Sequence, residues 1–196
     1  MVGIVLAFII AYLIGSIPYG FILTKLVAKQ DIRAVGSGNI GATNVLRTGN
    51  KLLAFTTLLL DASKGVVAIL FISIFLPFGA NAIAIGLFAI IGHCFPIWLN
   101  FKGGKGVATA LGVLLAAVPV AGLIACGVWL ASAFAFRISS LAALIAIGSA
   151  PFVVFVIYGA SPAVVCLFIA ALIFWRHKAN IQRLMKGTEP KIGVQK

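Results

Sequence analysis

Residues 36–47 combine glycines with neutral hydrogen-bond donors and end in an arginine, a composition that suits an anion. Glycines let the backbone turn tightly and bring successive N–H groups close to one anion. Ser37, Asn39 and Thr43 add neutral donors, and Arg47 adds a planar fork that matches two phosphate oxygens. On a helix, Thr43 and Arg47 would face one point because they are four residues apart. A flexible surface loop is the plain alternative, but the segment has no Glu or Lys, so we favour anion binding.

The segment 101–109 places three glycines around Lys105 and runs directly into an apolar stretch. Free N–H groups of Gly103 and Gly104, a helix N-terminus and a lysine together would form a phosphate cradle. The glycine spacing differs from that of a nucleotide-binding P-loop. A glycine-rich turn that carries two lysines for membrane topology explains the composition equally well.

A third polar cluster begins at Arg176, where the last apolar run ends. His177 and Asn180 are three residues apart and would share one face of a helix, and Arg183 follows in the same cluster. A basic helix that contacts lipid phosphates would explain the arginines, but it gives no reason for the histidine and the asparagine. This cluster is therefore a third candidate for the binding of an anionic substrate.

Four further polar positions lie in or beside apolar runs. Asp61 and Lys64 are three residues apart inside a long apolar segment, where ionisable groups are costly and usually pair or serve function. We interpret them first as a structural ion pair and second as contributors to a site. Ser140 lies close to Arg137 in a small polar group, and His93 is interpreted as a helix-end histidine.

The composition excludes a soluble domain and predicts which side of a membrane carries these loops. Hydrophobic residues make up 63% of the chain, and the mean hydropathy is +1.22. The 15 Lys and Arg residues concentrate in 25–51, 99–105, Arg137 and 176–196, whereas the loops between these regions carry no charge. Because positive loops stay in the cytoplasm, we expect all of the polar chemistry at the cytoplasmic face.

We predict an all-α integral membrane protein with seven transmembrane helices, some of them short. Parity decides the count, because a single crossing in 106–136 would place Arg137 and the C-terminal cations outside. We therefore divide that stretch into two short helices that turn near residues 118–119. The N-terminus is then outside, the C-terminus is cytoplasmic, and residues 1–196 form one membrane domain with a mobile basic tail. The expected spans are 3–24, 51–76, about 80–99, two in 106–136, 138–157 and 162–176.

Three anion-binding loops at one face indicate a substrate that carries phosphate. The net charge of +12 is the ordinary signal of membrane topology, so we expect anionic lipids and substrates as partners and no nucleic acid. Asp31, Asp61 and Glu189 are the only acidic residues, too few and too scattered for a Mg²⁺ cage. We therefore expect neither a metal nor a cofactor. The three cysteines have no metal or disulfide spacing.

The segments 37–47, 103–109 and 177–189 resemble the three motifs of the PlsY family. Members of this family are bacterial membrane enzymes that acylate glycerol 3-phosphate with acyl phosphate. The resemblance implies a multi-pass enzyme of the bacterial cytoplasmic (inner) membrane whose active site faces the cytoplasm. It also implies that the enzyme forms lysophosphatidic acid and phosphate in the first step of phospholipid synthesis. The acyl-phosphate-forming enzyme is then an expected partner.

The resemblance also implies roles for individual residues. Ser37 and Arg47 would belong to the active centre, the turn 103–105 would hold the phosphate of glycerol 3-phosphate, and Glu189 would be structural. Together with the residue chemistry, this predicts catalytic roles for Ser37, Arg47, Lys105, His177 and Asn180, and substrate binding by Asn39, Thr43, Gly103, Gly104 and Ser140.

An acyl phosphate is already activated, so the enzyme has mainly to overcome repulsion between two phosphates and to align the hydroxyl. We expect direct attack, with deprotonation by substrate phosphate or by His177, and an acylated Ser37 is the less favoured route. A transporter of a phosphate-bearing solute is the competing class. It would need polar groups through the outer half of the spans, where this chain has Ala, Ile, Leu, Val and Phe.

Overall fold

The computed structural model describes residues 2–75 and 82–193, and every regular element within these ranges is helical. The loop expected near 77–81 and the end of the C-terminal tail, 194–196, lie outside the described residues. The α-helices are α1 (Val2–Ser16), α2 (Tyr19–Val27), α3 (Ala42–Val45), α4 (Lys51–Ser73), α5 (Ala82–Cys94), α6 (Val107–Ala117), α7 (Pro119–Phe136), α8 (Ser139–Tyr158), α9 (Ala160–Arg176) and α10 (Lys178–Met185). Short 3-10 turns are η1 (Ile32–Ala34), η2 (Leu46–Thr48) and η4 (Ile97–Leu99).

Most of these helices have the length and hydropathy of membrane spans. Within residues 2–75 and 82–193, five stretches are long and apolar enough to cross a bilayer, among them α1 with α2 and α5 with η4. There are six when α9 is joined to α10 across their 65° bend. Helix α6 is apolar but has only 11 residues. The all-α architecture is therefore confirmed, while seven crossings and the sides of the two termini stay predictions.

Prolines set several helix boundaries. The span expected over 3–24 is confirmed as one candidate span, Val2–Val27. Its helix is not continuous, because Pro18 separates α1 from α2: proline lacks an N–H group and its ring obstructs the preceding turn. Helix α5 itself ends at Cys94, before Pro96, and η4 extends this candidate span to the expected residue 99. The predicted break in 106–136 is confirmed, since Pro119 begins α7 directly after Val118. The two halves are unequal, with 11 and 18 residues.

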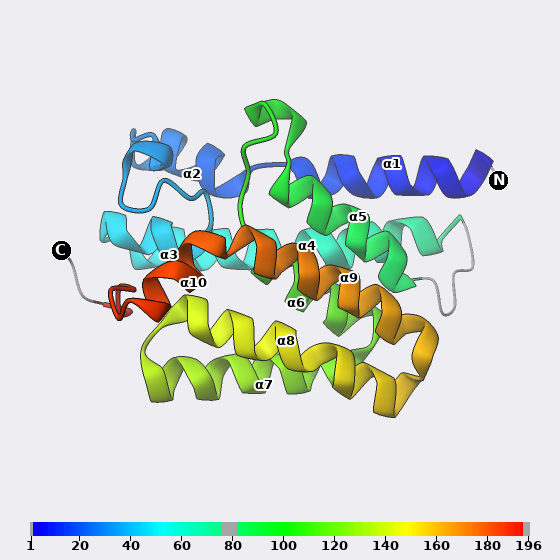
Figure 1. Cartoon of the computed structure of the whole chain (residues 1–196). Helices are drawn as coiled ribbons and strands as arrows, with labels where there is room; N and C mark the ends of the chain where they lie inside the picture. Colours follow the sequence, from blue (N-terminus) through cyan, green and yellow to red (C-terminus); the bar gives the residue numbers. More distant parts are fainter. Residues whose placement is uncertain (1, 76–81, 194–196) are drawn as a thin grey trace.

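Glycines allow close contacts between the long helices. A Cβ atom at Gly15 of α1 would overlap the main chain of α5 at Ala89, and one at Gly112 of α6 would overlap α4 at Ala62. Such contacts bring backbones together, as is typical of helices that pack in membranes. Helix α6 lies in the interior of the bundle, in contact with α4, α5 and α7 (Figure 1).

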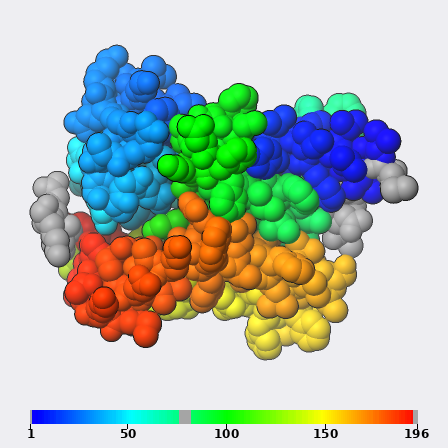
Figure 2. All heavy atoms as spheres, turned by 45° about the horizontal axis from the view of Figure 1, so that its top comes forward, coloured from blue at the N-terminus to red at the C-terminus, as the bar shows by residue number. Residues whose placement is uncertain are grey.

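The segment between α2 and α4 folds into a compact cap with its own small core. Ile32, Ile40 and Val45 are buried there against Leu53 of α4 and Leu99 of η4. The cap, α10 and the C-terminal segment, residues 186–193, all lie at the end of the bundle opposite the N-terminus (Figure 1). In the space-filling view the cap faces the C-terminal segment across this end (Figure 2). The three polar segments of the sequence therefore meet in space.

Candidate active site

A cavity of about 900 Å³ lies at this end of the bundle, between the cap, α4, α6, α7, α8 and the C-terminal segment. Its lining combines polar side chains, here called the polar wall, with apolar ones, here called the apolar wall. The polar wall includes Ser37, Asn39, Thr43, Arg47, Lys105, Ser139, Ser140, His177, Asn180, Arg183 and Glu189. The apolar wall includes Leu58, Val107, Leu111, Cys126, Trp129, Leu130 and Ala143.

The structure brings eight of the ten predicted site residues to this one cavity. All five predicted catalytic residues line it, as do three of the predicted binding residues, Asn39, Thr43 and Ser140. They come from segments that are more than 100 residues apart in the sequence, as Ser37 and Asn180 are. The two glycines of the predicted phosphate cradle, Gly103 and Gly104, are not among the described residues of the wall.

Asn44 holds the first loop in shape, a role that the sequence analysis missed. Its side chain is buried, and its Oδ1 accepts the N–H of Ser37 at 3.0 Å. Its Nδ2 donates to the carbonyls of Ile32, Val35 and Asn39 at 2.9–3.1 Å. An amide that supplies both donor and acceptor was the available signal in the motif, but only the folded loop shows where its partners lie.

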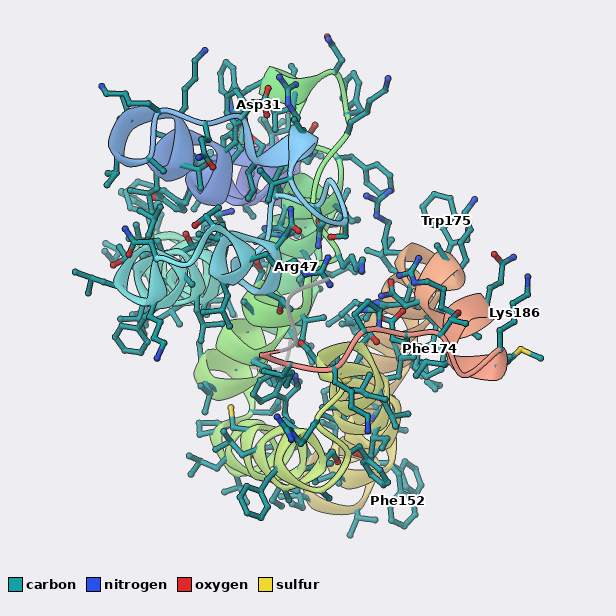
Figure 3. All side chains as sticks on the ribbon, turned by 90° about the vertical axis from the view of Figure 1, so that its left-hand side faces the viewer. Asp31, Arg47, Phe152, Phe174, Trp175 and Lys186 are labelled. Atoms are coloured by element: carbon teal, nitrogen blue, oxygen red, sulfur yellow. The ribbon has the colours of Figure 1, made fainter. Side chains whose placement is uncertain are left out.

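Arg47 reaches the cavity from the helical turn that follows the loop. Helix α3 passes directly into η2, so Thr43 and Arg47 stay one turn apart and both line the cavity. A Cβ at Gly36 would lie 2.9 Å from Nη1 of Arg47, so the side chain lies across that glycine, whose φ of 53° is left-handed. Figure 3 shows Arg47 between the cap and the helices α9 and α10. Thr43 Oγ1 lies 3.1 Å from Ser139 Oγ of α8.

Glu189 organises the opposite side of the cavity. Its Oε1 accepts hydrogen bonds from Ser140 Oγ at 2.7 Å and from Asn180 Nδ2 at 2.6 Å, and its Oε2 pairs with Arg183 Nε at 2.6 Å. Burial alone would raise the pKa of Glu189, but these three donors lower it below its usual value. The ionised carboxylate thus orients Asn180, whose Oδ1 accepts a hydrogen bond of 2.5 Å from Lys105 Nζ.

Lys105 carries a cation into a confined and strongly positive site. Burial is the main cause that lowers its pKa to about 8. Glu189 acts in the opposite direction, and Arg183, Arg47 and Arg176 add to the lowering. Lys105 therefore remains mainly protonated at neutral pH, but its charge is poorly solvated and available to an incoming anion.

His177 is held as a neutral imidazole with a defined tautomer. Its Nδ1 lies 2.8 Å from the carbonyl oxygen of Ile173. Because a carbonyl can only accept, Nδ1 carries the proton and Nε2 keeps its lone pair. Burial lowers the pKa of His177 to about 4, so the side chain is neutral at physiological pH and is a weak base in the free protein.

The expected cradle of free N–H groups at Gly103 and Gly104 is wrong in its geometry. The N–H of Gly103 donates to the carbonyl of Cys94 at 3.2 Å, and that of Gly104 donates to the carbonyl of His93 at 3.0 Å. Both groups are therefore used inside the protein. Lys105, Gly106 and the start of α6 at Val107 and Ala108 are the residues of this segment that line the cavity.

A buried polar cluster lies beneath this turn. The predicted ion pair is confirmed, since Lys64 Nζ lies 2.6 Å from Asp61 Oδ1 and both side chains are buried. His93 belongs to the last turn of α5, as expected, but its Nδ1 also lies 3.1 Å from Lys64 Nζ. Thr109 of α6 donates to the carbonyl of Asp61 at 2.8 Å. Asp61 and His93 reach the cavity wall, so the cluster links the site to the centre of the bundle.

The arrangement suits an amphipathic anion. Arg47, Lys105 and Arg183 offer positive charge at the polar wall, and the apolar wall from α4, α6 and α7 offers room for a hydrocarbon chain. Within residues 2–75 and 82–193, no three His, Cys, Asp or Glu side chains gather closely enough to hold a metal ion. The chemistry on offer is thus charge neutralisation and alignment next to an apolar chain.

Comparison with known proteins gives one consistent result. The family model for glycerol-3-phosphate acyltransferase matches residues 5–187. The glycerol-3-phosphate acyltransferase of Jannaschia sp. (strain CCS1) is 54% identical over 185 residues, which cover 94% of this chain and 91% of that protein. That of Mesorhizobium japonicum is 51% identical over 193 residues, with 98% of each chain covered.

Solved structures agree with the sequence relatives. The crystal structure of PlsY, described as an integral membrane glycerol 3-phosphate acyltransferase, in its glycerol 3-phosphate form has a TM-score of 0.90 at 40% identity and covers 96% of this chain and 95% of its own. The lysophosphatidic acid form of PlsY has a TM-score of 0.87 at 39% identity, with the same coverage.

Proposed function

Because the chain belongs to the glycerol-3-phosphate acyltransferase family and is a multi-pass membrane enzyme, we propose that its acyl donor is an acyl phosphate. The acyl group moves to the 1-hydroxyl of glycerol 3-phosphate, and the products are lysophosphatidic acid and inorganic phosphate. In a bacterium this is the first step of phospholipid synthesis. The acyl-phosphate-forming enzyme is the proposed supplier of the donor.

The single observation that carries this proposal is the lining of the cavity, which combines cations with apolar side chains. A donor with a phosphate head and an acyl chain needs both cations and apolar surface, and the lining of this cavity supplies both. Arg47, Lys105 and Arg183 together can offset the repulsion between the phosphate of the acceptor and the phosphate of the donor. A thioester donor would bring no second phosphate to the reacting centre and would leave this concentration of cations unexplained.

In the proposed reaction the acceptor hydroxyl attacks the acyl carbonyl directly. The acyl phosphate is a mixed anhydride, so no covalent intermediate on Ser37 is needed to activate it. Arg47 and Ser37 approach from the cap, and Lys105 and Asn180 approach from the opposite wall. Cations on both sides stabilise the oxyanion and the phosphate that leaves.

Substrate phosphate is the proposed acceptor of the hydroxyl proton. A phosphate monoester has a second pKa of roughly 6, whereas burial lowers the pKa of His177 to about 4. A phosphate monoester in water is therefore a stronger base than His177 in the ligand-free protein. His177 then contributes its Nε2 lone pair as a hydrogen-bond acceptor that orients the hydroxyl.

We further propose seven crossings of the bacterial cytoplasmic membrane, with the N-terminus outside and the cavity at the cytoplasmic face. The positive-inside rule and the position of the cap, α10 and the C-terminal segment at one end support this orientation. Helix α6, with 11 residues, reaches only about 16 Å at 1.5 Å per residue. This crossing is therefore shorter than a bilayer core of roughly 30 Å, as expected for one of the short helices.

The test uses purified protein in detergent with glycerol 3-phosphate and one of two donors, an acyl phosphate or an acyl thioester of the same chain length. We expect phosphate release and lysophosphatidic acid, identified by mass spectrometry, with the acyl phosphate alone. Lys105→Met and Arg47→Lys serve as site controls and should lose most of the activity. Product formed from the thioester at an equal or higher rate would contradict the proposed donor.

A further inference from the structure

Arg176, the last residue of α9, holds the backbone of the turn that carries Lys105. Its Nε donates to the carbonyl of Gly104 at 3.0 Å, and its Nη2 donates to the carbonyl of Gly103 at 2.9 Å. The side chain is half-buried, and Arg176 is not among the described residues that line the cavity. It therefore contacts the protein next to the site and not the space where substrate would lie.

The same two peptide units are held from their other side by α5. The N–H groups of Gly103 and Gly104 donate to the carbonyls of Cys94 and His93. A Cβ at Gly103 would overlap the carbonyl of His93, and one at Gly104 would overlap the His93 ring. The turn is thus packed against the end of α5 and closed on the outside by Arg176.

The guanidinium of Arg176 is itself oriented by aromatic rings. Its Cζ lies 5.2 Å from the ring centre of Phe95 and 5.9 Å from that of Trp175. These are distances at which a cation is attracted to an aromatic face. Figure 3 shows Trp175 on the outer side of α9. A planar fork can bond two neighbouring carbonyls at once, which an ammonium group on a flexible stem does poorly.

We propose that Arg176 is a positioning residue of the phosphate site, acting through Lys105 without touching substrate. The inference rests on the proposed role of Lys105 in phosphate binding. Two residues four positions apart in the sequence hold Lys105 from both ends. Arg176 donates hydrogen bonds to the backbone that precedes Lys105, and Asn180 accepts a hydrogen bond from the Nζ of Lys105. The end of α9 and helix α10 thereby fix both the backbone next to Lys105 and its ammonium group.

The alternative is that Arg176 is only one more cytoplasmic cation that sets topology. Lys178, two residues further on, is exposed and supplies a matched control for that effect. In the test, kcat/KM for glycerol 3-phosphate is measured for wild type, Arg176→Gln, Arg176→Lys and Lys178→Gln in detergent. We expect a loss of tenfold or more for Arg176→Gln, a smaller loss for Arg176→Lys, and a change within twofold for Lys178→Gln. Equal effects of the two glutamine variants would overturn the proposal.

A double-mutant cycle separates positioning from a general loss of structure. If Arg176 acts through Lys105, Arg176→Gln should cost less than threefold in a Lys105→Met background, where there is no ammonium left to place. A purely structural role would give the same fold loss in both backgrounds, which would sink the proposal.

Hydrogen exchange provides a reading that does not depend on activity. The amides of Gly103 and Gly104 should exchange faster in Arg176→Gln than in Lys178→Gln, while exchange in α8 stays unchanged. Unchanged exchange at Gly103 and Gly104 would refute the proposal that Arg176 holds this turn, even if activity fell. If wild-type protein proved inactive with acyl phosphate, the proposed donor would fail, but this exchange experiment would still decide the role of Arg176.

Discussion

Gly104→Ala is a sharp test of how the phosphate turn is built. The backbone at Gly104 is not left-handed, so alanine meets no conformational penalty there. The cost comes from contact, because the new Cβ would overlap Nε2 of the His93 ring. That ring is buried and bonded to Lys64, so it has little freedom to move away.

The magnitude follows from the cost of overpacking, which is typically about 1–3 kcal/mol. At 1.36 kcal/mol per factor of ten, that cost corresponds to roughly fivefold to 150-fold if all of it displaces the turn and Lys105. We expect it mainly as a higher KM for glycerol 3-phosphate, because Lys105 is displaced from its place at the cavity wall. The methyl group points into the protein, so it does not block the phosphate directly.

The assay is steady-state kinetics of phosphate release, together with thermal unfolding in detergent. Gly127→Ala is the matched control, since a Cβ there meets nothing within 4 Å. The double variant His93→Ala with Gly104→Ala, compared with His93→Ala alone, should suffer much less from the added methyl because the overlapping ring is gone. Strict additivity of the two substitutions, or a KM equal to that of Gly127→Ala, would refute the reasoning.

Three further predictions follow from the site. Arg47→Lys should lower kcat/KM by tenfold or more, about 1.4 kcal/mol, because an ammonium cannot hold two phosphate oxygens in one plane. Arg33→Lys, at an exposed ion pair with Asp31, should stay near wild type in the same assay. The pKa of Lys105 is lowered to about 8, and we propose that its cation binds phosphate. We therefore expect kcat/KM to fall as pH rises through about 8, and Lys105→Arg to lack this limb in a pH profile. Acyl transfer should persist in a chelator such as EDTA, and complete inhibition that Mg²⁺ reverses would contradict a metal-independent reaction.

Local patterns in the sequence predicted most of the helices and the pairing of close neighbours. Long apolar runs give helices because a bilayer or a buried bundle requires internally bonded backbone, and the break at Val118–Pro119 followed from the length of 106–136 and from parity. The Asp61–Lys64 pair was predictable because residues three apart on one helix are neighbours whatever the helix packs against. Pro18 carried an equally local signal, and the break between α1 and α2 could have been read from it.

Only the tertiary structure decided how the polar groups are used. The sequence shows that Gly103 and Gly104 are compatible with a phosphate cradle, but their N–H partners come from the end of α5 and their carbonyl partner from α9. The tautomer of His177 likewise depends on one carbonyl of α9. A hydrogen bond needs its two atoms within a few tenths of an ångström of the right separation, and residue types alone do not contain that information.

Two kinds of information about the site can therefore be distinguished. Candidate anion-binding segments could be identified in the sequence, because glycine, arginine, lysine and small donors occur at neighbouring positions. The contacts that link these segments could not be identified in the sequence. Glu189 joins Ser140, Asn180 and Arg183 only after α8, α10 and the C-terminal segment have packed together. Packing of distant elements determines which donor meets which acceptor, and that pairing brings three separate polar loops together around one cavity.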